Sequence, residues 1–200
     1  IDDSNATKNC HSEGHGIGRA LYKANPNFAA VIRQCGHTCT DGCFHGAMMQ
    51  MFVTDSDTLG GAIDDESPEA YVRHIRDEAL SLCARPEVAS VVRPQYCAHG
   101  LGHIFAYFSP TDVSDAVHSC EQMRNGYDIE SCASGAFMEY LFTASTSAMY
   151  AYKGEAPCDR FPTHKRACYM YKAYVWLVAW QTPDAALAAC DTFGGDADLC

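Results

Sequence analysis

Cysteine content constrains the fold of this chain more than any other feature. There are 12 cysteines in 200 residues, an even number that is several times ordinary usage. Such a count is typical of a disulfide-bonded protein in an oxidising compartment or of an intracellular protein with metal clusters. The sequence contains no CxxC and no CxxCH motif, which argues against zinc ribbons, iron–sulfur clusters and covalent haem. We therefore expect disulfides and a secreted, extracellular or periplasmic location.

Charge and hydropathy exclude two classes of partner. The formal net charge is −11, with only 14 Lys and Arg, which argues against binding to nucleic acid or to an anionic membrane surface. No apolar run reaches the roughly 18 residues that a membrane span requires.

The 48% hydrophobic content is enough for one core, so we expect a single domain over residues 1–200. The beginning Ile-Asp-Asp indicates a mature, processed chain.

A repeat becomes visible when the chain is aligned on a Cys-x-His-Gly pattern. Four blocks share this register, and 14-GHGIGRALY precedes them without the cysteine: 43-CFHGAMMQMF, 97-CAHGLGHIFAYF, 132-CASGAFMEYLF and, less well, 168-CYMYKAYVWL. The register positions are His15, His45, His99, Ser134 and Met170. A second element begins near a proline, has helical spacing and ends in cysteine: 26-PNFAAVIRQC, 68-PEAYVRHIRDEALSLC, 110-PTDVSDAVHSC and 183-PDAALAAC.

These two elements predict an all-α fold, a stack of about five disulfide-linked helical hairpins of roughly 35 residues each. The expected units are 10–42, 43–96 with an inserted loop at 54–67, 97–131, 132–167 and 168–200. The architecture resembles that of Sel1-like and TPR repeat proteins by analogy only, because their unit signature is absent. Cys200 stands where a further unit would open, so we expect that the natural chain can continue past it.

The repeat also predicts how the cysteines pair. Each second helix ends in a cysteine and the next unit opens with one after a short link. The expected pairs are Cys10–Cys39, Cys35–Cys43, Cys83–Cys97, Cys120–Cys132, Cys158–Cys168 and Cys190–Cys200. A rival assignment, Cys35–Cys39 with Cys10–Cys43, remains open at this point.

Five of the nine histidines fall in the repeat blocks and are the candidate metal ligands: His11, His15, His45, His99 and His103. Residues four apart share one face of a helix, so the first two and the last two form chelating pairs. Equivalent positions of successive units line one surface of a stack, which would bring all five together. A capping role explains a single His-Gly pair but not a second histidine one turn later.

Copper, zinc and non-haem iron are the metals that histidine donors suit here, and the sequence does not resolve them. Met49 and Met138, each one turn after a register position, favour copper. Three acidic residues close to the register are further candidates for a ligand or base, although a solvated or capping role is the simpler interpretation: Asp41, Glu130 and Glu139.

Two alternatives remain beside a metal site. Non-covalent haem is a less favoured cofactor, with paired histidines among nearby aromatic side chains (Phe44, Phe105, Tyr107, Phe108). The chain could instead be a solenoid that binds a protein partner or forms homo-oligomers, with histidines that only cap helices. Whether the protein is an enzyme is left open.

Overall fold

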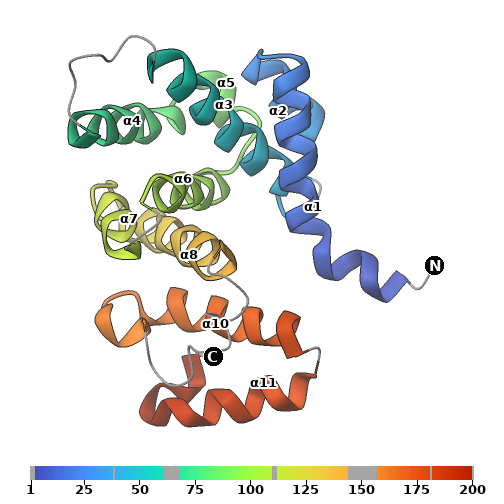
Figure 1. Cartoon of the computed structure of the whole chain (residues 1–200), viewed down its shortest axis with the longest axis vertical. Helices are drawn as coiled ribbons and strands as arrows, with labels where there is room; N and C mark the ends of the chain where they lie inside the picture. The colour runs from blue at the N-terminus through green and yellow to red at the C-terminus, as the bar shows by residue number, and fades with distance from the viewer. Residues whose placement is uncertain are drawn as a thin grey trace.

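The computed structural model describes residues 3–37, 39–60, 68–109, 112–143, 157–180 and 182–199, and within these ranges every regular element is a helix (Figure 1). The all-α prediction is therefore confirmed. The elements are α1 (Asp3–Ala24), α2 (Phe28–Cys35), α3 (Gly42–Gly60), α4 (Pro68–Leu82), α5 (Pro86–Ala89), α6 (Pro94–Phe108), α7 (Val113–Cys120), α8 (Gly126–Thr143), the 3₁₀ turn η1 (Cys158–Arg160), α10 (Lys165–Trp180), α11 (Pro183–Cys190) and the 3₁₀ segment η2 (Asp191–Leu199).

Helices α1 and α3 cross in close contact, and glycines at the crossing make this possible (Figure 1). A methyl group added at Gly18 would overlap the backbone of Cys43. One added at Gly46 would overlap the backbone of His15. Because no side chain separates the two backbones here, the histidines of α1 and α3 are brought close together.

Helices α6 and α8 repeat this crossing in the second half of the described chain. A methyl group at Gly102 would overlap the backbone of Cys132, and one at Gly135 would overlap the backbone of His99. The glycine of the Cys-x-His-Gly pattern therefore serves helix packing. Helix α3 also contacts α6, so the two tight pairs meet, while α10 packs on α8.

The short helices α2, α7 and α11 end in cysteine, as the sequence predicts. Asn27 caps α2 by accepting from the Ala30 amide, and Asp112 caps α7 by accepting from the Ser114 amide. Helix α11 begins at Pro183 without a side-chain cap. Their buried faces join a continuous apolar core whose largest fully buried side chains include those of Phe44, Leu101, Phe137 and Tyr169.

Disulfides join α2 to α3 and α7 to α8, and three more tie the turn before α3, the end of α4 and η1 to long helices. The bonds are Cys10–Cys39, Cys35–Cys43, Cys83–Cys97, Cys120–Cys132 and Cys158–Cys168, the same pairs that the repeat predicts. The rival pairing of the first four cysteines is therefore not adopted. The remaining pair, Cys190–Cys200, involves a residue that lies outside the described ranges.

The expected inserted loop at 54–67 is in part helical. Residues 54–60 of the expected inserted loop continue α3 as helix, and residues 61–67 lie outside the described ranges. A regular stack of five equivalent hairpins, with the unit boundaries given above, stays a prediction. None of the described helices combines the length and the apolarity that crossing a membrane requires.

Candidate metal centre

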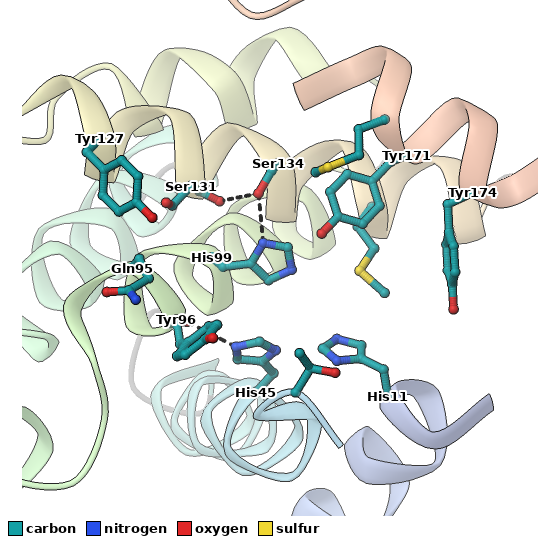
Figure 2. Close-up of a pocket in the computed structure, with 13 residues that line it drawn as sticks. His11, His45, Gln95, Tyr96, His99, Tyr127, Ser131, Ser134, Tyr171 and Tyr174 are labelled. Atoms are coloured by element: carbon teal, nitrogen blue, oxygen red, sulfur yellow. Dashed lines mark hydrogen bonds between the residues drawn. The ribbon is translucent and has the colours of Figure 1, made fainter. Parts of the chain in front are cut away.

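The five predicted histidines gather in one place, where the first tight helix pair meets α6. Helix α1 supplies His11 and His15, α3 supplies His45, and α6 supplies His99 and His103. The ring centroids of the contacting pairs lie 4.7 to 6.2 Å apart. Figure 2 shows three of them facing one space from three different helices.

Four of these imidazoles form a set that could hold one metal ion. His11, His15, His45 and His103 each offer a ring nitrogen, and these nitrogens all lie within 4.8 Å of one another. The Nε2 atoms of His11 and His15 are 3.0 Å apart and form a hydrogen bond, in which His15 donates to the lone pair of His11. Two nitrogens bound to one ion at about 2.0–2.1 Å lie roughly 3 Å apart, so this spacing suits a chelate. His99 is outside the set of four, with its ring 4.9 Å from that of His103.

The backbone fixes the orientation of two rings. His11 Nδ1 donates to the carbonyl oxygen of Cys39 at 3.1 Å, which leaves its Nε2 with a lone pair. His45 Nε2 donates to the carbonyl oxygen of Tyr96 at 3.0 Å, which leaves Nδ1. That second nitrogen of His45 is buried and has no hydrogen-bond partner.

Side chains of α8 fix the two histidines of α6. His103 Nδ1 lies 2.9 Å from Glu139 Oε2, and its buried Nε2 has no partner. His99 Nδ1 lies 2.8 Å from Ser134 Oγ. The serine hydroxyl donates to the carbonyl of Ser131 at 2.7 Å, so it accepts from His99 and leaves Nε2 of that ring with a lone pair (Figure 2).

This pattern is the one that metal-binding histidines show. A ligating imidazole normally donates its other N–H to a carbonyl or carboxylate, which sets the tautomer and the ring orientation. Here His11, His45 and His103 have such an outer partner, and His99 has a serine hydroxyl in that place. A buried nitrogen without a hydrogen bond costs about 1–3 kcal/mol, and the cluster contains two of them, His45 Nδ1 and His103 Nε2. A metal ion would satisfy both.

Burial keeps the cluster uncharged. Desolvation lowers the pKa of His15 and of His99 to about 3, and the neighbouring imidazoles add to this effect. The same causes hold the pKa of His45 and His103 well below the usual value, and burial also lowers the pKa of His11. All five rings are therefore neutral at pH 7, which is the form that binds metal.

Glu139 is an acidic residue in direct contact with the cluster, through His103. Burial raises the pKa of its carboxyl to about 7, while the Arg19 guanidinium acts in the opposite direction. Since burial disfavours the charged form of both His103 and Glu139, their contact is best described as a hydrogen-bonded pair that shares a proton. A metal cation bound to His103 would favour the ionised carboxylate of Glu139 over its protonated form.

The other predicted candidates have structural partners. Asp41 lies 3.0 Å from His37, and Glu130 lies 2.9 Å from His164 and accepts from the Ala167 amide at the start of α10. Neither belongs to the set of four donors. Met49 Sδ accepts from Arg19 at 3.4 Å. Their roles in this structure are ion pairing, capping and packing.

The turn before α3 is backbone-strained. Cys39, Thr40 and Asp41 have φ values of 55°, 53° and 60°, a region that costs non-glycine residues energy. The Cys10–Cys39 disulfide ties this turn to α1. The turn presents the Cys39 carbonyl to His11, so the strain coincides with an orienting contact of the cluster.

Two cavities reach the cluster. One of about 450 Å³ is lined by His11, His45 and His99, and one of about 310 Å³ is lined by His15 and His103. Met138, one of the predicted sulfur residues, lines both. The cluster is thus accessible from two directions.

Comparisons of the chain with protein-family models, with curated proteins and with solved structures give no match. The site therefore rests on its own geometry. Sequence reasoning found all five imidazoles and named Glu139, but it did not find the carbonyls of Cys39 and Tyr96, which carry no side-chain signal, or the role of Ser134. The repeat register at position 134 was the available clue.

Proposed function

We propose that this protein binds a first-row transition metal ion through His11, His15, His45 and His103, with His99 as a fifth donor beside them. One observation carries the proposal: nitrogens of four imidazoles, three of them oriented by an outer partner, lie within 4.8 Å of one another, and two of those rings have a buried nitrogen without a partner. Leaving buried polar atoms without a hydrogen-bond partner is costly unless a ligand satisfies them.

The donor set suits copper, zinc or non-haem iron. Imidazole donors favour these ions, and none of the described cysteines is free to add a thiolate. A bound ion of this kind supplies Lewis acidity or, for copper and iron, electron transfer. Haem is disfavoured, because a macrocycle far wider than an imidazole would have to enter between rings whose centroids are 4.7 to 6.2 Å apart. The disulfides favour an extracellular or periplasmic location.

Metal analysis of the full chain, purified without a histidine tag, tests the proposal. We expect about one ion per chain by mass spectrometry, and the absorption spectrum separates copper, iron and colourless zinc. His103→Gln should lose the ion, whereas His118→Gln, which alters an exposed imidazole paired with Glu121, should keep it.

Two results would overturn the proposal. One is a metal content at background together with a stability that chelator does not change. The other is equal metal content in His103→Gln and the unaltered protein. Either would favour the alternative of a helical interaction module in which the histidines serve packing alone.

A further inference from the structure

The larger cavity opens at the surface and ends at the histidine cluster. Its floor includes His45, only 1% exposed, while Tyr127 and Met170 stand at its mouth with 68% and 44% exposure. Exposed large apolar side chains are few among the described residues, and two of them border this one cavity. Figure 2 shows that Tyr171 and Tyr174 of α10 form one wall, opposite Tyr127 and Gln95.

No charged side chain lines this cavity within the described part of the chain. Its walls carry aromatic rings, thioethers and neutral polar groups: His11, Thr40, His45, Gln95, Tyr96, His99, Tyr127, Ser131, Ser134, Met138, Met170, Tyr171 and Tyr174. In the metal-free protein, an ion entering this space would lose hydration without gaining a counter-charge from the walls.

Charged side chains lie around the cavity and line the two neighbouring cavities. The smaller cavity, which also reaches the cluster, has Arg19 and Glu139 in its walls. A depression next to the mouth has Glu130 and Arg166. Charged groups are thus available nearby, yet they stay out of the space above His45 and His99.

We propose that the larger cavity binds a small uncharged aromatic molecule that carries a hydroxyl group, seated directly against the histidine cluster. Tyrosine rings and methionine sulfurs favour an aromatic body, since edge and face contacts with rings and sulfur are favourable. The hydroxyl of Ser131 and the amide of Gln95 supply polar partners for a hydroxyl. The volume of about 450 Å³ lies within the range of small-molecule sites and holds a single-ring compound.

This inference deepens the proposed function, because it gives the centre a ligand class, but binding of the aromatic molecule does not itself need the metal. Three probes of similar shape separate the effect of ligand charge on affinity from the effect of shape. They are benzyl alcohol, benzoate and benzylammonium, measured at pH 7.5. We expect benzyl alcohol to bind the full chain with a Kd of about 1 mM, as suits so small a ligand. In the metal-free protein, both ions should bind at least tenfold more weakly.

Position is tested by NMR and by a matched pair of variants. Imidazole protons of His45 and His99 should show nuclear Overhauser effects to the benzyl ring. Tyr127→Ala should weaken binding about fivefold by removing a ring contact. Tyr107→Ala is the control, because Tyr107 is also exposed, at 42%, and lies outside the cavity lining.

The measurement is made on chelated and on metal-loaded protein. Discrimination among the probes in the chelated protein, without any metal uptake, would sustain this inference and overturn the metal proposal. Metal uptake together with equal affinity for the three probes would support the metal proposal and overturn this inference. Two results would contradict binding next to the cluster. One is the absence of nuclear Overhauser effects from the benzyl ring to His45 and His99. The other is an equal loss of benzyl alcohol affinity in Tyr127→Ala and Tyr107→Ala.

Discussion

His103 Nδ1 on α6 lies 2.9 Å from Glu139 Oε2 on α8, and both side chains are buried. The contact crosses the second tight helix pair and leaves His103 Nε2 directed to no protein partner. A carboxylate behind an imidazole fixes the ring and strengthens its basicity toward a metal. This relationship makes Glu139 an orienting group of the centre.

Glu139→Gln tests that role. The amide keeps the size of the side chain and can still accept a hydrogen bond, but it removes the negative charge behind His103. We expect metal affinity to fall about 10- to 100-fold, measured by competition with a chromophoric chelator. Glu121→Gln is the control, because Glu121 is exposed and lies outside the donor cluster. Equal affinities in the two variants would contradict an orienting role.

Metal removal should lower thermal stability. An ion present at about 100 times its Kd stabilises the folded state by about 2.7 kcal/mol, which for a chain of this size corresponds to a Tm shift of roughly 5–10 °C. Calorimetry with and without chelator measures it, and added metal should restore the Tm. His45→Asn should show no chelator effect, whereas His37→Asn, at the surface, should respond as the unaltered protein does. A chelator shift that persists in His45→Asn would contradict the ligand set.

His164 gives a pH dependence that is separate from the cluster. Hydrogen bonding to Glu130 raises its pKa in the folded state, with Glu121 adding to the effect and burial opposing it. Its contribution to stability is therefore fully present below the unfolded pKa of about 6.5 and is lost as pH rises through the folded pKa. His164→Gln should destabilise by about 1 kcal/mol at pH 5.5, since Glu130 is partly exposed and screened, and by less at pH 9.

Chemical denaturation at the two pH values measures this difference. His74→Gln provides the control at an exposed position. A destabilisation by His164→Gln that grows with pH would contradict the assigned direction of the shift.

Local signals in the sequence account for much of the fold. Proline near the start and cysteine at the end mark α2, α7 and α11. Short links between cysteines favour the pairs Cys83–Cys97, Cys120–Cys132 and Cys158–Cys168. Spacing by four along a helix placed His11 with His15, and His99 with His103, on common faces. Each of these features depends on residues close together in the chain, which is why periodicity and spacing were enough.

The rest depends on contacts between distant segments. The crossing of α1 with α3 follows from backbone contact at Gly18 and Gly46, which a sequence pattern does not orient in space. The carbonyl of Tyr96 becomes a partner of His45 only because α6 begins beside α3. Helix α3 continues past residue 54 to Gly60, although the polar composition there suggested a loop.

The glycine crossing can be tested with a matched pair of substitutions. Gly46→Ala would place a methyl group in the backbone of His15, so we expect a destabilisation of about 1–3 kcal/mol and loss of metal, because α1 and α3 must separate. Gly16→Ala, also on a helix, has open space around the added methyl and should raise stability by about 0.5–1 kcal/mol. Denaturant unfolding with metal analysis gives both values. Similar effects of the two variants would rule out a close crossing.

The Cys10–Cys39 disulfide should matter to the metal as well as to stability. It holds the strained turn whose carbonyl orients His11, so the double variant Cys10→Ser/Cys39→Ser should lose about 2–4 kcal/mol of stability and about tenfold in metal affinity. Cys158→Ser/Cys168→Ser removes a bond between η1 and α10, elements that supply none of the donors. It should cost comparable stability and leave metal affinity unchanged. Both variants are compared at a temperature at which circular dichroism shows them folded, and equal metal affinities would mean that the Cys39 turn takes no part in positioning His11.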